Sequence, residues 1–334
     1  MTPVEQEVAA RLLARRKQLA ELAQVRQEQR LVDLLRRVEG ALAGLEIGDW
    51  GTCTVCHEPI SVERLEADPL IKVCLECLTV EERHSLERDL EAAARLQRSL
   101  LPPPRLAHGG WELAFLWEPR GAVSGDHVDL LRPQRDDEPL HLLLGDVVGK
   151  GVAASLLQSH LHALFRALAA PDLPLGELLA RVNRIFFEAT TGKSYATMVA
   201  ARLHAGGRVE LANAGHPRPL LADARGVRPV EGAGLPLGLF AGGGYESREL
   251  SLRGGETLLV YSDGWTEATA ADDEEFGIGR AAAALRRAAK LAPAEVVAAC
   301  RGDMETFLAG RPRTDDLTLL ALRRNGGSGR YVSS

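Results

Sequence analysis

The N-terminal part of the chain carries apolar residues at helical spacing. Between Val4 and Leu45 there is no Pro, and the only two Gly lie near the end of the segment. We predict one amphipathic helix of coiled-coil type over residues 1–47, because apolar residues recur every three or four positions, at Leu31, Leu34, Leu35, Val38, Leu42 and Leu45. Its apolar stripe needs a covering surface, which is a second helix, a second subunit or the cysteine-rich module that follows.

A second helical pattern runs from Thr79 to Leu101. It begins with the cap-like sequence Thr79-Val80-Glu81-Glu82, and Pro102-Pro103-Pro104 cannot continue it. We assign residues 83–104 to a linker helix. Its inner face carries Leu86, Leu90, Ala93, Ala94, Gln97 and Leu100.

Beyond Gly109 the pattern changes to short apolar runs between Gly, Pro and Asp turns. This pattern of short apolar runs, together with two or three helical stretches, predicts an α+β domain over residues 105–324. The clearest strand candidates are His141 to Leu144, Tyr195 to Arg202, Val209 to Ala212 and Thr257 to Tyr261. The tail, residues 325–334, is rich in Gly and Ser, and we predict it to be disordered.

Composition narrows the classes of function. A length of 334 residues favours two domains, and 40 Lys plus Arg against 46 Asp plus Glu leave no broad cationic field for nucleic acid. The N-terminus lacks the pattern of an export signal, and no run of 18 apolar residues without a charge offers a membrane span. We therefore expect a soluble, cytoplasmic protein that binds neither nucleic acid nor membrane.

Four of the five cysteines form two Cys-x-x-Cys pairs. Cys53 and Cys56 are separated by 17 residues from Cys74 and Cys77, which is typical of one tetrahedral Zn²⁺ site with four thiolates. Such a site has no open position, so it is predicted to hold structure. A redox-active dithiol is the competing interpretation. For Cys300 we predict the role of a buried small hydrophobe.

The segment around these cysteines resembles the zinc finger of DksA/TraR proteins. The resemblance lies in Ile47 to Ile60, in Glu63 to Pro69 and in the second cysteine pair, and it defines a module over residues 48–82. That family binds RNA polymerase through acidic residues at the tip of a coiled coil. Because no equivalent tip is recognisable in this sequence, only the zinc fold is carried over, and a contact with RNA polymerase stays open.

Four acidic motifs punctuate the second domain: Ser124-Gly125-Asp126, Gly145 to Gly151, Ser262-Asp263-Gly264 and Thr314 to Thr318. Each Asp ends an apolar run, usually beside Gly, which indicates carboxylates displayed at strand ends. Hard oxygen ligands of this kind suit Mg²⁺ or Mn²⁺. One such motif alone would be read as an Asp-Gly turn, whereas four in succession favour a metal site.

The order of these motifs resembles the SpoIIE-like, RsbU-type branch of the metal-dependent protein phosphatases (the PPM superfamily), from about Leu90 to Arg323. Other family-like segments are Leu96 to Pro102, Ala212 to Pro217, Leu235 to Gly238 and Phe276-Gly277. The resemblance implies a four-layer α-β-β-α sandwich that binds two Mn²⁺ or Mg²⁺ ions. The ligands it implies are Asp126, Asp146, Asp263 and Asp315 with the carbonyl of Val147, and Asp316 as an alternative to Asp315.

Several positions depart from the family pattern without removing a carboxylate. These are Ser124 in place of Gly, His127-Val128 in place of an aromatic pair, Val148 in place of a small polar residue and Ser262 in place of Thr. For His127 and His216 we favour packing roles over catalysis. Arg120 is a candidate for contacting phosphate.

The resemblance implies a protein-serine/threonine phosphatase that uses a metal-activated water. Its expected substrate is a phosphorylated protein, usually a STAS-type anti-sigma-factor antagonist in a partner-switching pathway, and its expected assembly is a homodimer. We further hypothesise that the N-terminal modules set the pose of the linker helix and thereby order the metal site. The alternatives are an inactive interaction protein that contacts the transcription machinery through its zinc module, and hydrolysis of a small phosphorylated metabolite.

Overall fold

The computed structural model describes residues 3–25, 29–133, 135, 138–190, 194–232, 234–271 and 273–324. The chain divides into two compact units, Met1–Asp89 and Leu90–Ser334, called the N-terminal and C-terminal units below. The predicted disordered tail, residues 325–334, lies outside the described residues. None of the described helices combines the length and the hydropathy that a bilayer span requires.

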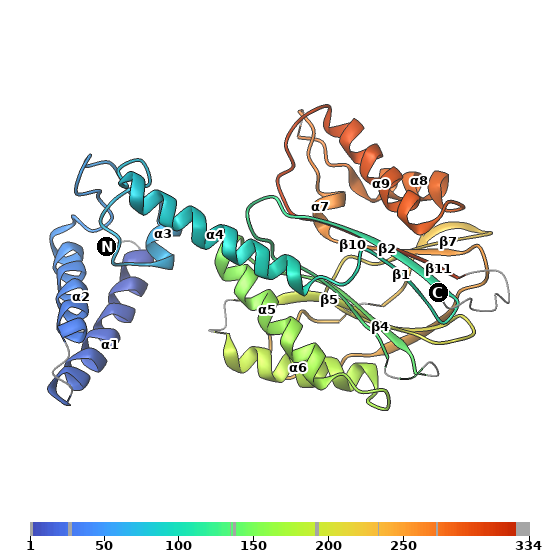
Figure 1. Ribbon diagram of the computed structural model, residues 1–334, viewed down its shortest axis with the longest axis horizontal. Coiled ribbons are helices and arrows are strands. Elements are labelled where there is room, and N and C mark those ends of the chain that lie inside the picture. The colour runs from blue at the N-terminus through green and yellow to red at the C-terminus, as the bar shows by residue number, and fades with distance from the viewer. Residues whose placement is uncertain are drawn as a thin grey trace. The chain divides into compact units, whose positions relative to one another are not determined.

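The N-terminal unit begins with two helices, α1 (Pro3–Val25) and α2 (Gln29–Ile47), which pack against each other (Figure 1). The prediction of one continuous helix over residues 1–47 is therefore wrong. Two helices allow the chain to bury its own apolar stripe, which a single helix cannot do. The shared core of α1 and α2 consists of Val8, Leu12, Leu19, Val38, Ala41 and Leu45. Of the covering surfaces considered above, the structure thus provides a second helix from the same segment.

The cysteine-rich module follows and includes the short helix α3 (Val62–Ala67). Helix α4 (Val80–Leu100) then starts with a capping box, in which Glu82 N–H donates to Thr79 Oγ1 (3.2 Å) and Thr79 N–H donates to Glu82 Oε2 (3.0 Å). The C-terminal half of α4, from Leu90 onward, belongs to the C-terminal unit, where Ala94 and Gln97 are buried. The structure therefore differs from the prediction of a separate linker over residues 83–104.

The C-terminal unit contains two sheets in which every pairing is antiparallel. The six-stranded sheet has the order β1 (Arg105–His108), β2 (Trp111–Glu118), β11 (Leu317–Arg324), β10 (Thr257–Tyr261), β7 (Leu220–Asp223) and β8 (Gly226–Pro229). The five-stranded sheet has the order β3 (Asp126–Leu131), β4 (Leu140–Val147), β5 (Ala196–Leu203), β6 (Arg208–Ala214) and β9 (Ser247–Ser251). The four predicted strands correspond to β4, β5, β6 and β10.

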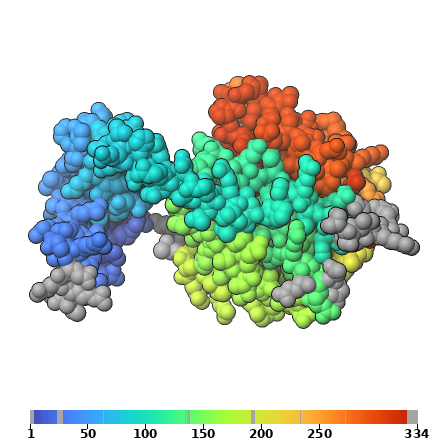
Figure 2. All heavy atoms as spheres, viewed as in Figure 1, coloured from blue at the N-terminus to red at the C-terminus, as the bar shows by residue number. Residues whose placement is uncertain are grey.

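Helices cover the outer faces of both sheets (Figure 1), and the green and the red segments of the chain that contain these helices lie on opposite sides of the C-terminal unit in the space-filling view (Figure 2). Helices α5 (Gly151–Leu168) and α6 (Leu175–Ala189) pack on the five-stranded sheet, and α8 (Gly277–Ala288) and α9 (Pro293–Leu308) pack on the six-stranded sheet. The short helix α7 (Asp263–Thr266) follows β10. This arrangement confirms the predicted four-layer α-β-β-α sandwich.

Burial on both faces of the sheets explains the continuous apolar runs. In β4, Leu142 and Leu144 belong to the core between the sheets, whereas Leu143 belongs to the core beneath α5 and α6. Alternate residues of a strand point to opposite faces, so a strand covered on both sides needs apolar residues throughout. Cys300 lies fully buried in the core beneath α8 and α9, as predicted for a small hydrophobe.

Candidate metal centres

Strand ends from both sheets carry the predicted aspartates to one region of the C-terminal unit. Asp126 opens β3 and Asp146 lies next to the end of β4, where the two are partners in the strand register. Asp263 is the first residue of α7, which follows β10, and Asp315 lies two residues before the start of β11. Four segments distant in sequence thus supply carboxylates that interact electrostatically, since Asp146 interacts with Asp126, Asp263 and Asp315.

Burial and like charge make these carboxylates costly to ionise in the protein alone. Burial raises the pKa of Asp146 to about 9, with further contributions from the charges of Asp126 and Asp263. Burial also raises the pKa of Asp126 to about 7, against the opposing effect of a hydrogen bond from Thr318. The pKa of Asp263 is raised by burial and by Asp315. A cluster of oxygen donors with excess negative charge fits hard divalent cations.

Two hydroxyl groups fix the orientation of Asp126. Ser262 Oγ donates to Asp126 Oδ2 at 2.9 Å, and Thr318 Oγ1 donates to the same oxygen at 2.5 Å. Thr318 N–H in turn donates to Ser262 Oγ (2.9 Å), so the Ser262 hydroxyl is itself held in place. Because Oδ2 accepts both bonds, Oδ1 is the oxygen left for a cation. In the sequence, Thr318 is only the last residue of an acidic motif and Ser262 only a departure from the family pattern, so no local signal indicates that they bind Asp126.

The neighbouring aspartates Asp315 and Asp316 have different surroundings. Asp316 accepts three hydrogen bonds from the loop before β3, from Arg120 N–H (2.6 Å), Ser124 Oγ (2.7 Å) and Gly125 N–H (2.9 Å). These bonds occupy both of its oxygens. Asp315 Oδ2 pairs with Lys150 Nζ at 2.8 Å and Asp315 Oδ1 accepts the N–H of Asp316 at 2.9 Å, but the side chain of Asp315 is 44% exposed and has no bond to this loop. Asp316 therefore holds the loop, while Asp315 is open to the site.

The carbonyl of Val147 lies beside the carboxylate of Asp146. A Cβ atom added at Gly125 would lie 2.9 Å from Val147 O and 3.0 Å from Asp146 Oδ1. Both oxygens therefore face the same point of the loop, and only glycine allows this close approach. Two of the predicted oxygen donors, Val147 O and Asp146 Oδ1, thus lie beside Gly125.

The two histidines singled out in the sequence have structural roles. His216 Nε2 donates to Tyr261 O (3.0 Å) and its Nδ1 accepts from Thr197 Oγ1 (2.7 Å), which links β10 to β5 across the two sheets. Burial lowers the pKa of His216 to about 3, so the ring is neutral. His127 is fully buried, accepts from Gln158 Nε2 at Nδ1 (2.8 Å) and stacks on Phe165.

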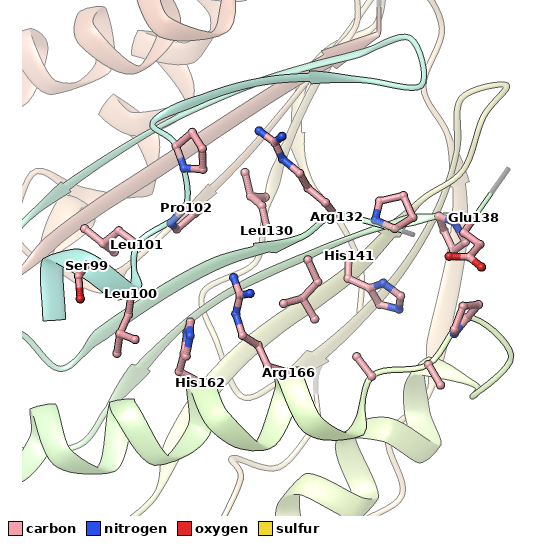
Figure 3. A pocket seen from close by; sticks show the side chains of 17 residues that line it. Ser99, Leu100, Leu101, Pro102, Leu130, Arg132, Glu138, His141, His162 and Arg166 are labelled. Atoms are coloured by element: carbon pink, nitrogen blue, oxygen red, sulfur yellow. The ribbon is translucent and has the colours of Figure 1, made fainter. Parts of the chain in front are cut away.

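His127, Asp129 and His162 form a second polar cluster in the C-terminal unit, and their ligand atoms lie close enough together to suggest a cation site. His162 of this cluster also lines a recess of about 740 Å³ (Figure 3). However, Arg166 Nε and Nη2 donate to the two oxygens of the fully buried Asp129, at 2.9 and 2.8 Å. Because the guanidinium already neutralises this carboxylate, the group is an internal ion pair.

The four paired cysteines converge in the N-terminal unit. Their sulfur atoms all lie within 4.8 Å of one another, and none of these cysteines forms a disulfide. By comparison, no three of the site aspartates have carboxylate oxygens within 4.8 Å of one another. The Cys56 to Cys74 Sγ distance of 3.6 Å is close to the roughly 3.8 Å expected for tetrahedral Zn–S bonds of about 2.3 Å. Backbone N–H groups of Cys56 and Cys74 lower the pKa of Cys53 to about 6, whereas the side chains of Cys56 and Cys74 raise the pKa of Cys77 to about 12. In the protein alone, one of these thiols therefore ionises readily and another does not.

Comparisons with known proteins give matches to each of the two units. Residues 48–83 match the prokaryotic dksA/traR C4-type zinc finger. The chain is 26% identical to phosphoserine phosphatase RsbP of Bacillus subtilis over 190 residues, which are 55% of this chain and 46% of that protein. The chain spans about half the length of the curated relatives it matches.

Solved structures share the fold of the C-terminal unit. The SiaA-PP2C domain of Pseudomonas aeruginosa matches with a TM-score of 0.64 at 20% identity, over 74% of this chain and 99% of that one. The RsbU and RsbW domains of a Mycobacterium tuberculosis protein match with a TM-score of 0.56 at 30% identity, over 69% of this chain and 63% of that one. Residues 136–325 match the model of stage II sporulation protein E (SpoIIE). Because this match covers more than half of the 334-residue chain, the chain belongs to the SpoIIE family.

Proposed function

We propose that this protein is a metal-dependent serine/threonine phosphatase that hydrolyses a phosphoserine or phosphothreonine on a partner protein. The observation that carries the proposal is that Asp146 interacts electrostatically with Asp126, Asp263 and Asp315, which come from distant segments of the chain. The relative RsbP is named a phosphoserine phosphatase, which supports the same class of substrate.

The proposed cations are two Mn²⁺ or Mg²⁺ ions. Asp146 would be a ligand of both ions. Asp263 and Asp315 would complete the coordination of one ion, and the Val147 carbonyl and Asp126 Oδ1 would coordinate the other. Bound at this site, the two ions would neutralise the phosphoryl dianion and lower the pKa of a water molecule to near neutrality. Asp316 is assigned to the loop instead, because its carboxylate accepts three hydrogen bonds from the segment Arg120 to Gly125, whereas the side chain of Asp315 is 44% exposed.

The protein contributes mainly a fixed arrangement of charges. The hydroxyls of Ser262 and Thr318 hold Asp126 in one orientation, so the carboxylate needs no reorganisation during the reaction. In the hydrolysis, the water oxygen bonds to phosphorus while the bond from phosphorus to the seryl or threonyl oxygen breaks. A water proton ends on that oxygen, giving a free hydroxyl and inorganic phosphate.

The test of this proposal is release of inorganic phosphate by the full chain. We expect hydrolysis of p-nitrophenyl phosphate and of a synthetic phosphoserine peptide that requires Mn²⁺ or Mg²⁺ and stops when EDTA is added. Faster turnover of the peptide would support a protein substrate over a small metabolite. Folded protein that binds Mn²⁺ in calorimetry and yet releases no phosphate from either compound would refute the proposal.

For the N-terminal unit we propose a structural Zn²⁺ ion held by Cys53, Cys56, Cys74 and Cys77. For the biological setting we propose a cytoplasmic homodimer that acts on a STAS-type anti-sigma-factor antagonist. The M. tuberculosis structure, which contains RsbU and RsbW domains of one protein, supports a partner-switching context.

We also propose that α4 transmits the state of the N-terminal modules to the metal site. Gln97 Nε2 donates to Ser124 O (2.7 Å) and Gln97 Oε1 accepts from Ser124 N–H (3.0 Å), so α4 is bonded to the loop before Asp126. Replacing Leu90 and Leu100 with Glu is expected to change both the phosphatase rate and the oligomeric mass measured by light scattering. An unchanged rate together with an unchanged mass would exclude this coupling.

A further inference from the structure

We propose that Lys150 is a further catalytic residue, whose ammonium group binds a phosphoryl oxygen of the substrate and later of the phosphate product. This inference rests on the proposed phosphatase function and adds the group that recognises the anion. It follows from the backbone that presents Lys150, from the hydrogen bonds of its ammonium group and from the charge balance of the site.

The backbone holds Lys150 at the site between two glycines. Gly149 has φ +104° and Gly151 has φ +74°, and both lie in the left-handed region that other residues rarely adopt. No atom lies within 4 Å of a Cβ added at either glycine, so the requirement is conformational and not one of space. This arch joins the end of β4, which carries Asp146, to the start of α5.

The ammonium group of Lys150 has one uncommitted donor. Its Nζ lies 2.8 Å from Asp315 Oδ2 and 3.1 Å from the carbonyl oxygen of Thr314. Because a lysine ammonium carries three N–H donors, two are used and one remains. The side chain is 59% exposed, so the third donor is accessible to a ligand. Lys150 is thus already oriented beside a proposed metal ligand.

A recess next to this ammonium group offers room for a phosphorylated residue. It measures about 430 Å³, and Arg120, Val123, Lys150, Val152, Asp315 and Asp316 contribute to its lining. Arg120 is the second cation here, but its side chain is exposed and it is fixed only through its backbone N–H, which donates to Asp316. Lys150 is the cation whose charged group is itself held beside the proposed metal ligands.

The charges of the site also call for this cation. Five aspartates, Asp126, Asp146, Asp263, Asp315 and Asp316, contribute a formal charge of −5 when ionised. Two divalent ions add +4, which leaves −1, and the two cations that line the recess, Lys150 and Arg120, bring the sum to +1. A dianionic phosphoryl group then meets no net negative charge, and the free N–H donor of Lys150 belongs to the cation that is held beside Asp315.

The experiment measures binding of inorganic phosphate to the Mn²⁺-loaded full chain by isothermal titration calorimetry. Replacing Lys150 with Met is expected to raise the Kd of phosphate about 10- to 100-fold, the loss typical of a charge-assisted hydrogen bond. The Kd of Mn²⁺ is expected to stay the same or fall, because a cation beside the metal ligands has been removed. Lys150→Arg should lose less phosphate affinity than Lys150→Met, and the exposed Lys290→Met serves as a matched control.

Unchanged phosphate affinity in Lys150→Met would overturn the proposal and leave Lys150 as a counter-charge for Asp315. Weaker Mn²⁺ binding that accounts for the whole loss of phosphate affinity would overturn it as well, because Lys150 would then act through the metal. Phosphate binding requires no turnover, so this result is independent of hydrolysis. A wild-type chain that binds phosphate through Lys150 and hydrolyses nothing would refute the proposed function alone.

Discussion

Replacing Asp146 with Asn is expected to lower kcat for p-nitrophenyl phosphate at least about 10³-fold at saturating Mn²⁺. Asp146 interacts electrostatically with Asp126, Asp263, Asp315 and Asp316, which places it at the centre of the acidic group. Asn keeps the shape of the side chain but removes the charge that would bridge two cations. Metal ions contribute several kcal/mol to stabilising the transition state, and about 1.4 kcal/mol corresponds to a tenfold change in rate.

The Asp146→Asn protein should bind Mn²⁺ more weakly than the wild type in calorimetry, and its circular dichroism spectrum should show an intact fold. Asp172→Asn provides a matched control, because Asp172 is exposed and lies outside the acidic group; its kcat should stay within about twofold of the wild type. If Asp146→Asn kept more than about a tenth of the wild-type kcat, Asp146 could not be the bridging ligand.

Replacing both Cys53 and Cys74 with Ser is expected to unfold the cysteine-rich module. Both side chains are buried, and the rest of the module core contains only Ile60 and Leu65 as buried hydrophobic residues. A core this small does not sustain a fold without a metal. Structural Zn²⁺ sites contribute apparent binding free energies of about 10–16 kcal/mol, so losing the ion should remove most of the stability of the module.

Zinc content by mass spectrometry should fall from one ion per chain to none, and limited proteolysis should cut the module between residues 48 and 83. Cys300→Ala is the control, because Cys300 lies in the core beneath α8 and α9 and should not change the zinc content. A double Cys variant that still holds one Zn²⁺ per chain and resists proteolysis would contradict the four-thiolate site.

The N-terminal helices mark a limit of the sequence pattern. Residues 26–28, Arg-Gln-Glu, contain neither Gly nor Pro, and the apolar spacing is helical from Leu31 onward. Local periodicity therefore favoured one helix. The division into α1 and α2 becomes apparent only from the packing of Leu12 and Leu19 in one core with Val38 and Leu45. Burial of an apolar face is a tertiary effect that spacing along one segment does not encode.

The sequence by itself determined four strands of the sandwich, β4, β5, β6 and β10, together with the four acidic motifs and the two cysteine pairs. These features are local, because a strand buried on both faces needs a continuous apolar run and a turn at its end tolerates Asp and Gly. Asp315 and Asp316 could not be told apart in this way, since adjacent carboxylates give the same local signal.

Only the tertiary structure decided the roles of these neighbours. Asp316 is bound to Gly125 across 191 positions of sequence, and Asp126 is oriented by Ser262 and Thr318, which come from the other sheet. Hydrogen bonds of this kind depend on which strand ends meet when the two sheets stack. The sequence therefore determined which carboxylates are available, whereas the stacking of the sheets decided which of them are bound within the protein and which remain open to a cation.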